Sequence, residues 1–117
     1  MANRNKLIEA FISNLSTAIV HQVLEKAIDI NEISERYNKE VKNSWEIAKK
    51  YREKINPADK SLPGMDADYI KKKVTNKAKT ELKLRIERGY ENISLFLVEE
   101  FVEKAMKELA VAEPDKE

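Results

Sequence analysis

The chain has 117 residues, no cysteine, and 22 basic against 21 acidic side chains, which leaves a formal net charge of +1. This length predicts one domain, residues 1–117, with a core of its own, and the lack of cysteine excludes disulfides, zinc–thiolate sites, iron–sulfur clusters and thiol nucleophiles. Charged residues make up 37% of the chain against an average of about 25%, which is typical of long helices carrying many ion pairs.

The N-terminal segment MANRNKLIEAF does not have the form of a secretory signal. Arg4, Lys6 and Glu9 interrupt it, whereas a signal needs an uninterrupted apolar segment. The longest uncharged stretch, AFISNLSTAIVHQVL over residues 10–24, is shorter than the ~20 apolar residues of a membrane span. We therefore expect a cytoplasmic protein that does not enter a membrane.

Two helices are predicted in the first half of the chain. Apolar residues recur every three or four positions over residues 8–27 and again over residues 30–55, which is the period of one helix face. Asp29 and Glu32 have the spacing of a capping box, and this favours a break between a first helix over about 5–28 and a second helix from Ile30. The two apolar series are in phase, so one continuous helix is the alternative.

A loop and two further helices are predicted in the second half. Residues 56–65 contain two prolines and a glycine, so they cannot be helix interior. The third helix is expected from an N-cap at Asp66 to about Arg88, with Gly89 as its C-cap. Its apolar stripe is Ile70, Val74, Ala78, Leu82 and Ile86, and the stripe of a fourth helix is Ile93, Leu97, Phe101, Ala105 and Leu109.

No run of residues alternates with the period of two that marks a strand. The sequence therefore predicts an all-α fold, a small bundle of four helices arranged as two helical hairpins that the proline-rich loop joins. We expect the tail after the fourth helix, residues 113–117, to be disordered because it is short, charged and terminal.

The third helix is strongly basic. Residues 70–88 carry eight lysines and arginines against two glutamates, and such a face can bind nucleic acid through its phosphates. The candidate contacts are Lys71, Lys72, Lys73, Lys77, Lys79 and Lys83. The alternative is ion pairing, either within the helix, as Asp68–Lys72 and Glu81–Arg85, or with the acidic fourth helix.

The first helix lacks a charged face over residues 10–24, although a helix of a small bundle normally shows water such a face. A second line of residues runs beside its apolar stripe: Ser13, Thr17, Val20, Leu24 and Ile28. Either this helix lies at the centre of the fold, or this second line meets another subunit. The second alternative makes these five residues a candidate oligomer interface.

The parts needed for catalysis or metal binding are few. His21 is the only histidine, and Glu25 lies one turn further along the helix. A lone histidine on an apolar helix is more often a packed residue than a base or a ligand. We therefore expect no catalytic residue, metal site or cofactor. Tyr37, Trp45 and Tyr51 on the second helix have the spacing of core and boundary packing.

Two carboxylate pairs, Glu32/Glu35 and Glu100/Glu103, have the three-residue spacing that helical enzymes use to hold magnesium. All-α nucleotide pyrophosphatases use such pairs, but the gap between the two pairs is longer here than in that family. Each glutamate also has a cation four residues on, so surface ion pairing accounts for both pairs.

The sequence therefore favours a small, non-enzymatic helical interaction or assembly protein that self-associates, as a dimer, through its first helix, and that binds a protein partner. The alternative is a nucleic-acid-associated factor or subunit that binds through the basic third helix. A magnesium-dependent nucleotide hydrolase is a remote third function.

Overall fold

The computed structural model describes residues 4–28, 31–55, 62, 64–109 and 111. Four helices follow one another, α1 (Arg4–Ala27), α2 (Asn31–Ile55), α3 (Gly64–Glu87) and α4 (Phe96–Glu108), and these residues contain no strand. The predicted all-α bundle of two helical hairpins is confirmed. The tail over residues 113–117 lies outside the described residues, and so does most of the predicted loop.

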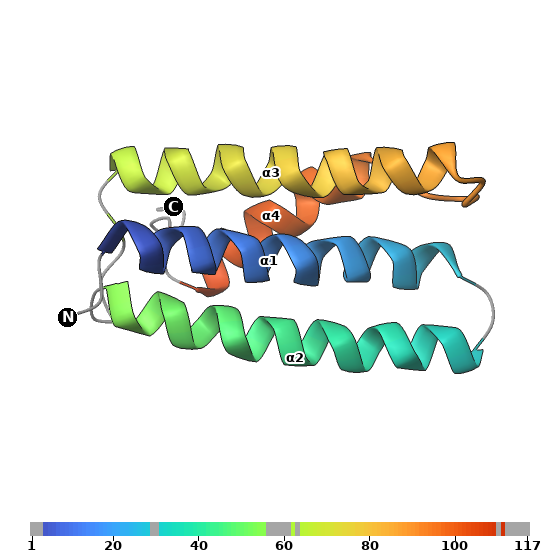
Figure 1. Cartoon of the computed structure of the whole chain (residues 1–117), viewed down its shortest axis with the longest axis horizontal. Coiled ribbons are helices and arrows are strands. Elements are labelled where there is room, and N and C mark those ends of the chain that lie inside the picture. Colours follow the sequence, from blue (N-terminus) through green and yellow to red (C-terminus); the bar gives the residue numbers. More distant parts are fainter. Residues whose placement is uncertain (1–3, 29–30, 56–61, 63, 110, 112–117) are drawn as a thin grey trace, which may run out of the picture.

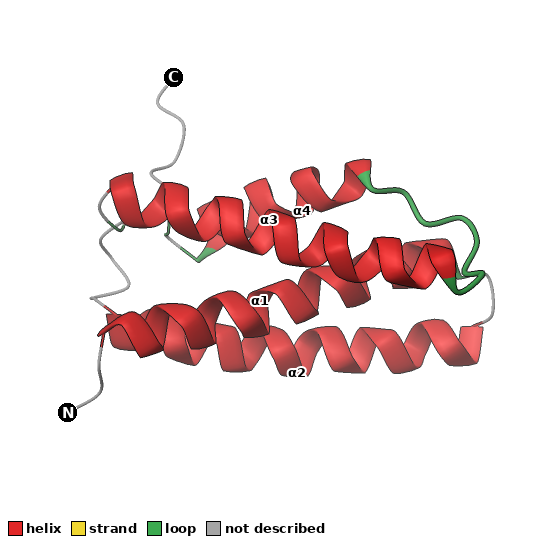
Figure 2. Cartoon of the chain, turned by 45° about the horizontal axis from the view of Figure 1, so that its top comes forward, coloured by secondary structure: helices red, strands yellow, loops and turns green. Residues whose placement is uncertain are grey.

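The helices are arranged as three plus one. α3, α1 and α2 lie side by side in a layer, and α4 lies behind α1 and α3 (Figures 1 and 2). α1 contacts each of the other three helices, whereas α2 contacts only α1 among the described helices. α1 is therefore the central helix, and one side of the layer has no helix of the described chain above it.

The first two helices are separate. α1 ends at Ala27 and α2 begins at Asn31, so the alternative of one continuous helix is wrong for this structure. Folding back lets the two in-phase apolar stripes pack on each other instead of pointing the same way into solvent. Asp29, the first residue of the expected capping box, lies outside the described residues.

One hydrophobic core joins all four helices, and α1 supplies the largest share of it. The buried apolar side chains of α1 are Ile8, Phe11, Ile12, Leu15, Ala18, Ile19, Val20, Val23 and Leu24. By length and composition α1 would pass as a membrane span, with a mean hydropathy of 1.3 over 18 residues, yet 56% of that window is buried inside the fold. We interpret α1 as a core helix, which accounts for much of its missing charge.

The start of α3 differs from the prediction. The helix begins at Gly64, so Asp66 is not the N-cap but lies in the first turn, where a carboxylate favours the positive end of the helix dipole. Asp66 also forms an ion pair with Arg4 of α1. Met65, expected in the loop, is therefore helical, while Leu62 before it is buried against the core.

The end of α3 agrees with the predicted cap. Gly89 has a φ of 100°, the Gly89 N–H donates to the Ile86 carbonyl at 3.0 Å, and the Tyr90 N–H donates to the Arg85 carbonyl at 3.0 Å. These two bonds form a Schellman motif, which needs the left-handed backbone that glycine adopts readily. Ile86, expected in the core, is 41% exposed at this end.

α4 is shorter than predicted, and of its predicted stripe only Ala105 and Leu109 are buried. It begins at Phe96, so Ile93 precedes the helix. Leu97 and Phe101, predicted for the core, are only half-buried, and the buried line runs through Val98 and Val102 one position further on. The buried side chains of α4 are Val98, Val102, Ala105 and Met106.

A buried arginine ties α2 to the end of α4. Arg52 is 1% exposed, and its Nε donates to the Leu109 carbonyl oxygen at 2.7 Å. Burial lowers the pKa of Arg52 because desolvation disfavours the charged guanidinium. Nearby, the Leu62 N–H donates to the Val111 carbonyl at 3.3 Å. This hydrogen bond joins Val111, which follows α4, to Leu62, which precedes α3.

Candidate functional site

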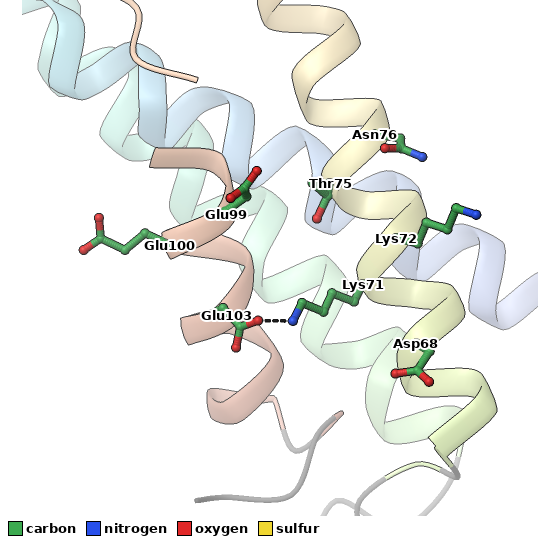
Figure 3. Close-up of a pocket in the computed structure, with 8 residues that line it drawn as sticks. All are labelled: Asp68, Lys71, Lys72, Thr75, Asn76, Glu99, Glu100 and Glu103. Carbon is green, nitrogen blue, oxygen red and sulfur yellow. Dashed lines mark ion pairs between the residues drawn. The ribbon is translucent and has the colours of Figure 1, made fainter. Parts of the chain in front are cut away.

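Two clefts of nearly equal volume lie on either side of α3, and each is lined by two of its lysines. The α3–α4 cleft measures about 550 Å³ and the α1–α3 groove about 540 Å³. The lining of the α3–α4 cleft is Asp68, Lys71, Lys72, Thr75, Asn76, Glu99, Glu100 and Glu103 (Figure 3). Four of these eight side chains are carboxylates, so this cleft is acidic overall.

Ion pairs across the α3–α4 cleft use two of the six candidate nucleic-acid contacts. Lys71 pairs with Glu103 (Figure 3), and Lys79 pairs with Glu99. The hydrogen bond from Lys79 lowers the pKa of Glu99, because the ammonium stabilises the charged carboxylate. For these two lysines the structure agrees with ion pairing to the acidic fourth helix.

The ion pairs expected within α3 do not form. Among the described residues neither Asp68–Lys72 nor Glu81–Arg85 lies within ion-pair distance. The Arg85 Cζ instead lies 5.6 Å from the centre of the Tyr90 ring.

The four other candidate lysines, Lys72, Lys73, Lys77 and Lys83, are exposed. In the part of the chain that the structure describes they have no carboxylate within ion-pair distance. Lys73 lies over an aromatic ring, with its Nζ 5.7 Å from the centre of Tyr69.

The α1–α3 groove brings together candidate interface residues of α1 and candidate phosphate contacts of α3. Its α1 wall is Ser13, Ser16, Thr17, Val20 and His21, and its α3 wall is Lys73, Asn76, Lys77, Thr80, Glu81 and Arg85. Three of the predicted interface residues thus face two of the predicted phosphate contacts. The sequence could not show this, because it does not tell which side of α1 packs beside which side of α3.

The α1 wall is polar but uncharged. The Ser16 hydroxyl donates to the Ile12 carbonyl at 2.6 Å, and the Thr17 hydroxyl donates to the Ser13 carbonyl at 3.0 Å. Such bonds to the preceding turn occupy the hydroxyl protons and leave the oxygens as acceptors. This wall therefore contributes hydroxyl groups and small side chains, while every charged group of the groove stands on α3.

His21 lies at the α2 side of the groove and is 17% exposed. Its Nε2 is 3.3 Å from a carboxylate oxygen of Glu40, and its ring centre is 5.6 Å from that of Tyr37. The expected partner Glu25 instead accepts a hydrogen bond from Asn38 at 3.3 Å. Burial lowers the pKa of His21; Glu40 opposes this shift and the nearby charge of Arg85 adds to it.

The predicted oligomer interface is only partly accessible. Val20 and Leu24 are 4% and 1% exposed, because α1 is central and its neighbours cover that side, so these two cannot contact a second subunit in this structure. Ser13 and Thr17 are exposed, and Ile28 is half-buried. The uncharged accessible face in the middle of α1, here called the open strip, consists of Ala10, Ser13, Asn14, Thr17 and His21.

The carboxylate pairs do not face each other. Glu35 stands on α2 and the pair Glu100/Glu103 on α4, and these two helices do not contact one another in the described chain. The side chain of Glu32 lies outside what the structure describes. Among the described residues no group of three or more His, Cys, Asp or Glu side chains could hold a metal ion.

Comparison with known proteins finds no matching family model, no matching curated protein and no matching solved structure.

Proposed function

We propose that this is a small non-enzymatic interaction protein that self-associates through the open strip of α1. The observation that carries the proposal is the three-plus-one arrangement, in which α4 covers one side of the layer only (Figure 2). The strip on the other side holds no lysine, arginine or carboxylate, whereas the neighbouring helices expose many. An uncharged strip between charged surfaces favours a contact in which water is excluded.

The strip suits the close approach of another helix. Ala10, Ser13 and Thr17 are small, and they recur at intervals of three and four residues, which places them on one face. A second copy of α1 is a self-complementary partner for such a face, because a twofold contact uses the same surface on both subunits. The strip itself contributes no charge to such a contact, and the charged groups beside it stand on α3.

The strip alone is too small for a stable dimer, which buries about 800 Å² on each partner. Flanking residues must take part. On α2, Ile33 lies one turn before Tyr37, whose ring contacts His21, and Ile33 is 38% exposed. On α3, Tyr69 lies one turn before Lys73 of the groove and is 43% exposed.

The test is the mass of the protein by size-exclusion chromatography with light scattering at micromolar concentration. We expect a dimer, and we expect Thr17→Arg to yield a monomer because it places a bulky charge in the strip. The control is Asn43→Arg, an exposed position about 200° around α2 from the buried Val41, which should stay dimeric. Circular dichroism checks that both variants fold. A monomeric wild-type protein at every concentration would overturn the proposal.

A nucleic-acid-associated role is the second candidate, favoured by the exposed lysines of α3 that have no carboxylate partner in the described chain. These are Lys72, Lys73, Lys77 and Lys83. Fluorescence anisotropy with labelled single-stranded and duplex oligonucleotides, at low and at moderate salt, tests it. Binding through phosphates weakens steeply as salt rises, and no binding at low salt would reject this role.

A further inference from the structure

We propose that the α1–α3 groove binds a phosphate-bearing ligand, with Lys73, Lys77 and Arg85 contacting the phosphate oxygens. The proposal does not depend on self-association, and because the groove shares Ser13, Thr17 and His21 with the open strip, a dimer contact on the strip would compete with the ligand. It arises from three observations: the charge of the groove, the unpaired polar atoms in it, and its volume.

The charge of the groove is positive, and its cations are not neutralised locally. Three cations and one carboxylate, Glu81, line it. Lys73 and Lys77 are four residues apart, so both project from one face of α3. Neither has a carboxylate within ion-pair distance among the described residues. Phosphate oxygens are strong acceptors for lysine and arginine donors.

The cleft on the other side of α3 provides an internal comparison. It has nearly the same volume, yet four carboxylates and two lysines line it, and Lys71 is paired with Glu103 (Figure 3). An anion would be repelled there. The unpaired Lys72 stands in that cleft among four carboxylates, whereas the unpaired Lys73 and Lys77 stand in a groove with one, so only the groove has an excess of positive charge.

Two buried nitrogen atoms of the groove have no hydrogen-bond partner in the described chain, His21 Nδ1 and Arg85 Nε. A buried polar atom without a partner is uncommon and calls for an explanation, such as an unseen ligand or water. Because Nε2 of His21 faces the Glu40 carboxylate, the proton of a neutral ring lies on Nε2, and Nδ1 is an acceptor.

The two atoms therefore need different partners. Arg85 Nε–H needs an oxygen that accepts, and His21 Nδ1 needs a group that donates. A molecule that carries a hydroxyl group near its phosphate supplies both, the phosphate oxygen to Arg85 and the hydroxyl proton to His21. Both nitrogens are buried in this structure, so binding requires the Arg85 side chain to shift.

The volume of about 540 Å³ lies within the range of roughly 300–1,000 Å³ that small-molecule sites occupy. The groove is thus large enough for a sugar phosphate or a mononucleotide. It is also open to solvent, so the phosphates of a single nucleic-acid strand are a second source of the same chemical group. The experiment has to distinguish these two sources.

The experiment is a chemical-shift titration of the ¹⁵N-labelled protein at low salt with ribose 5-phosphate, with ribose, and with a single-stranded oligonucleotide. We expect ribose 5-phosphate to shift amides of residues 13–21 and 73–85, and ribose to shift none. The double variant Lys73→Gln/Lys77→Gln should bind at least tenfold more weakly. The matched control Lys72→Gln/Lys83→Gln removes the same charge from the same helix outside the groove and should bind within twofold of wild type.

An oligonucleotide that shifts the same amides more strongly, and loses binding in the Lys73/Lys77 variant only, identifies nucleic acid as the source of the phosphate. Absence of shifts with both phosphate probes would overturn the proposal. Equal weakening by the two double variants would also overturn it, because binding would then follow net charge and not the groove. Light scattering on the same samples gives the oligomeric state, so self-association and ligand binding are judged separately.

Discussion

Replacing Arg52 with alanine should destabilise the fold by about 3 kcal/mol. The Leu109 carbonyl oxygen would lose its buried donor, which costs about 1–3 kcal/mol. Two methylene groups of the stem would also be lost from the core, at about 0.8 kcal/mol each. Relief of the desolvation that lowers the pKa of this guanidinium offsets part of the sum. For a domain of this size the expected fall in melting temperature is roughly 10 °C.

Urea denaturation followed by the fluorescence of Trp45, which is half-buried on α2, measures this change. Arg52→Met keeps an apolar stem without the charge and should cost less than alanine. Lys50→Ala removes an exposed cation from the same helix and should stay within about 0.5 kcal/mol of wild type. If Arg52→Ala were as stable as Lys50→Ala, the reasoning that this side chain fastens α4 to α2 would be refuted.

Three other substitutions test separate features. Gly89→Ala should lower the free energy of unfolding by about 1 kcal/mol, because the φ of 100° disfavours a side chain although nothing lies near the added Cβ. Gly64→Ala should be neutral or stabilising. Equal urea midpoints for the two variants would contradict this. Lys79→Gln should lower the melting temperature less than Arg52→Ala does, and the loss should shrink at high salt, since its ion pair with Glu99 is exposed. Because the pKa of His21 is lowered in the fold, the unfolded chain binds the proton more readily, and stability should fall as the pH drops below about 6.5. In His21→Gln the melting temperature should fall less steeply over that pH range. An unchanged slope would contradict the burial argument.

Much of the fold could be predicted because local signals agreed with tertiary packing. The periodic apolar residues indicated four helices. Gly89 indicated the end of α3, because a helix cap of this kind depends only on residues that are adjacent in the sequence. Asp66 was misplaced because a good N-cap residue also fits the first helical turn. In α4 the prediction was right for Ala105 and Leu109 but wrong for Leu97 and Phe101, because both lines of apolar residues fit one helix face and only the packing decides between them.

The candidate site could be predicted only in pieces. The basic face of α3 and the uncharged face of α1 are visible in the sequence, but the packing of one beside the other is a long-range property that no local pattern encodes. The same holds for Val20 and Leu24, whose burial depends on neighbouring helices, and for Glu40, which lies nineteen positions beyond His21 and is brought to it only by the α1–α2 hairpin.

Among the described helices α2 contacts only α1, and this bears on how two copies of the chain could exchange this helix. The same helix–helix packing is available on the α1 of a second molecule, whereas the contact of Arg52 with Leu109 lies outside it. The in-phase apolar stripes of α1 and α2 are also compatible with one continuous helix, in which α2 would extend away from the rest of its own chain. Domain swapping of α2 would then preserve its packing on α1, and within a single chain the Arg52–Leu109 hydrogen bond favours the closed form.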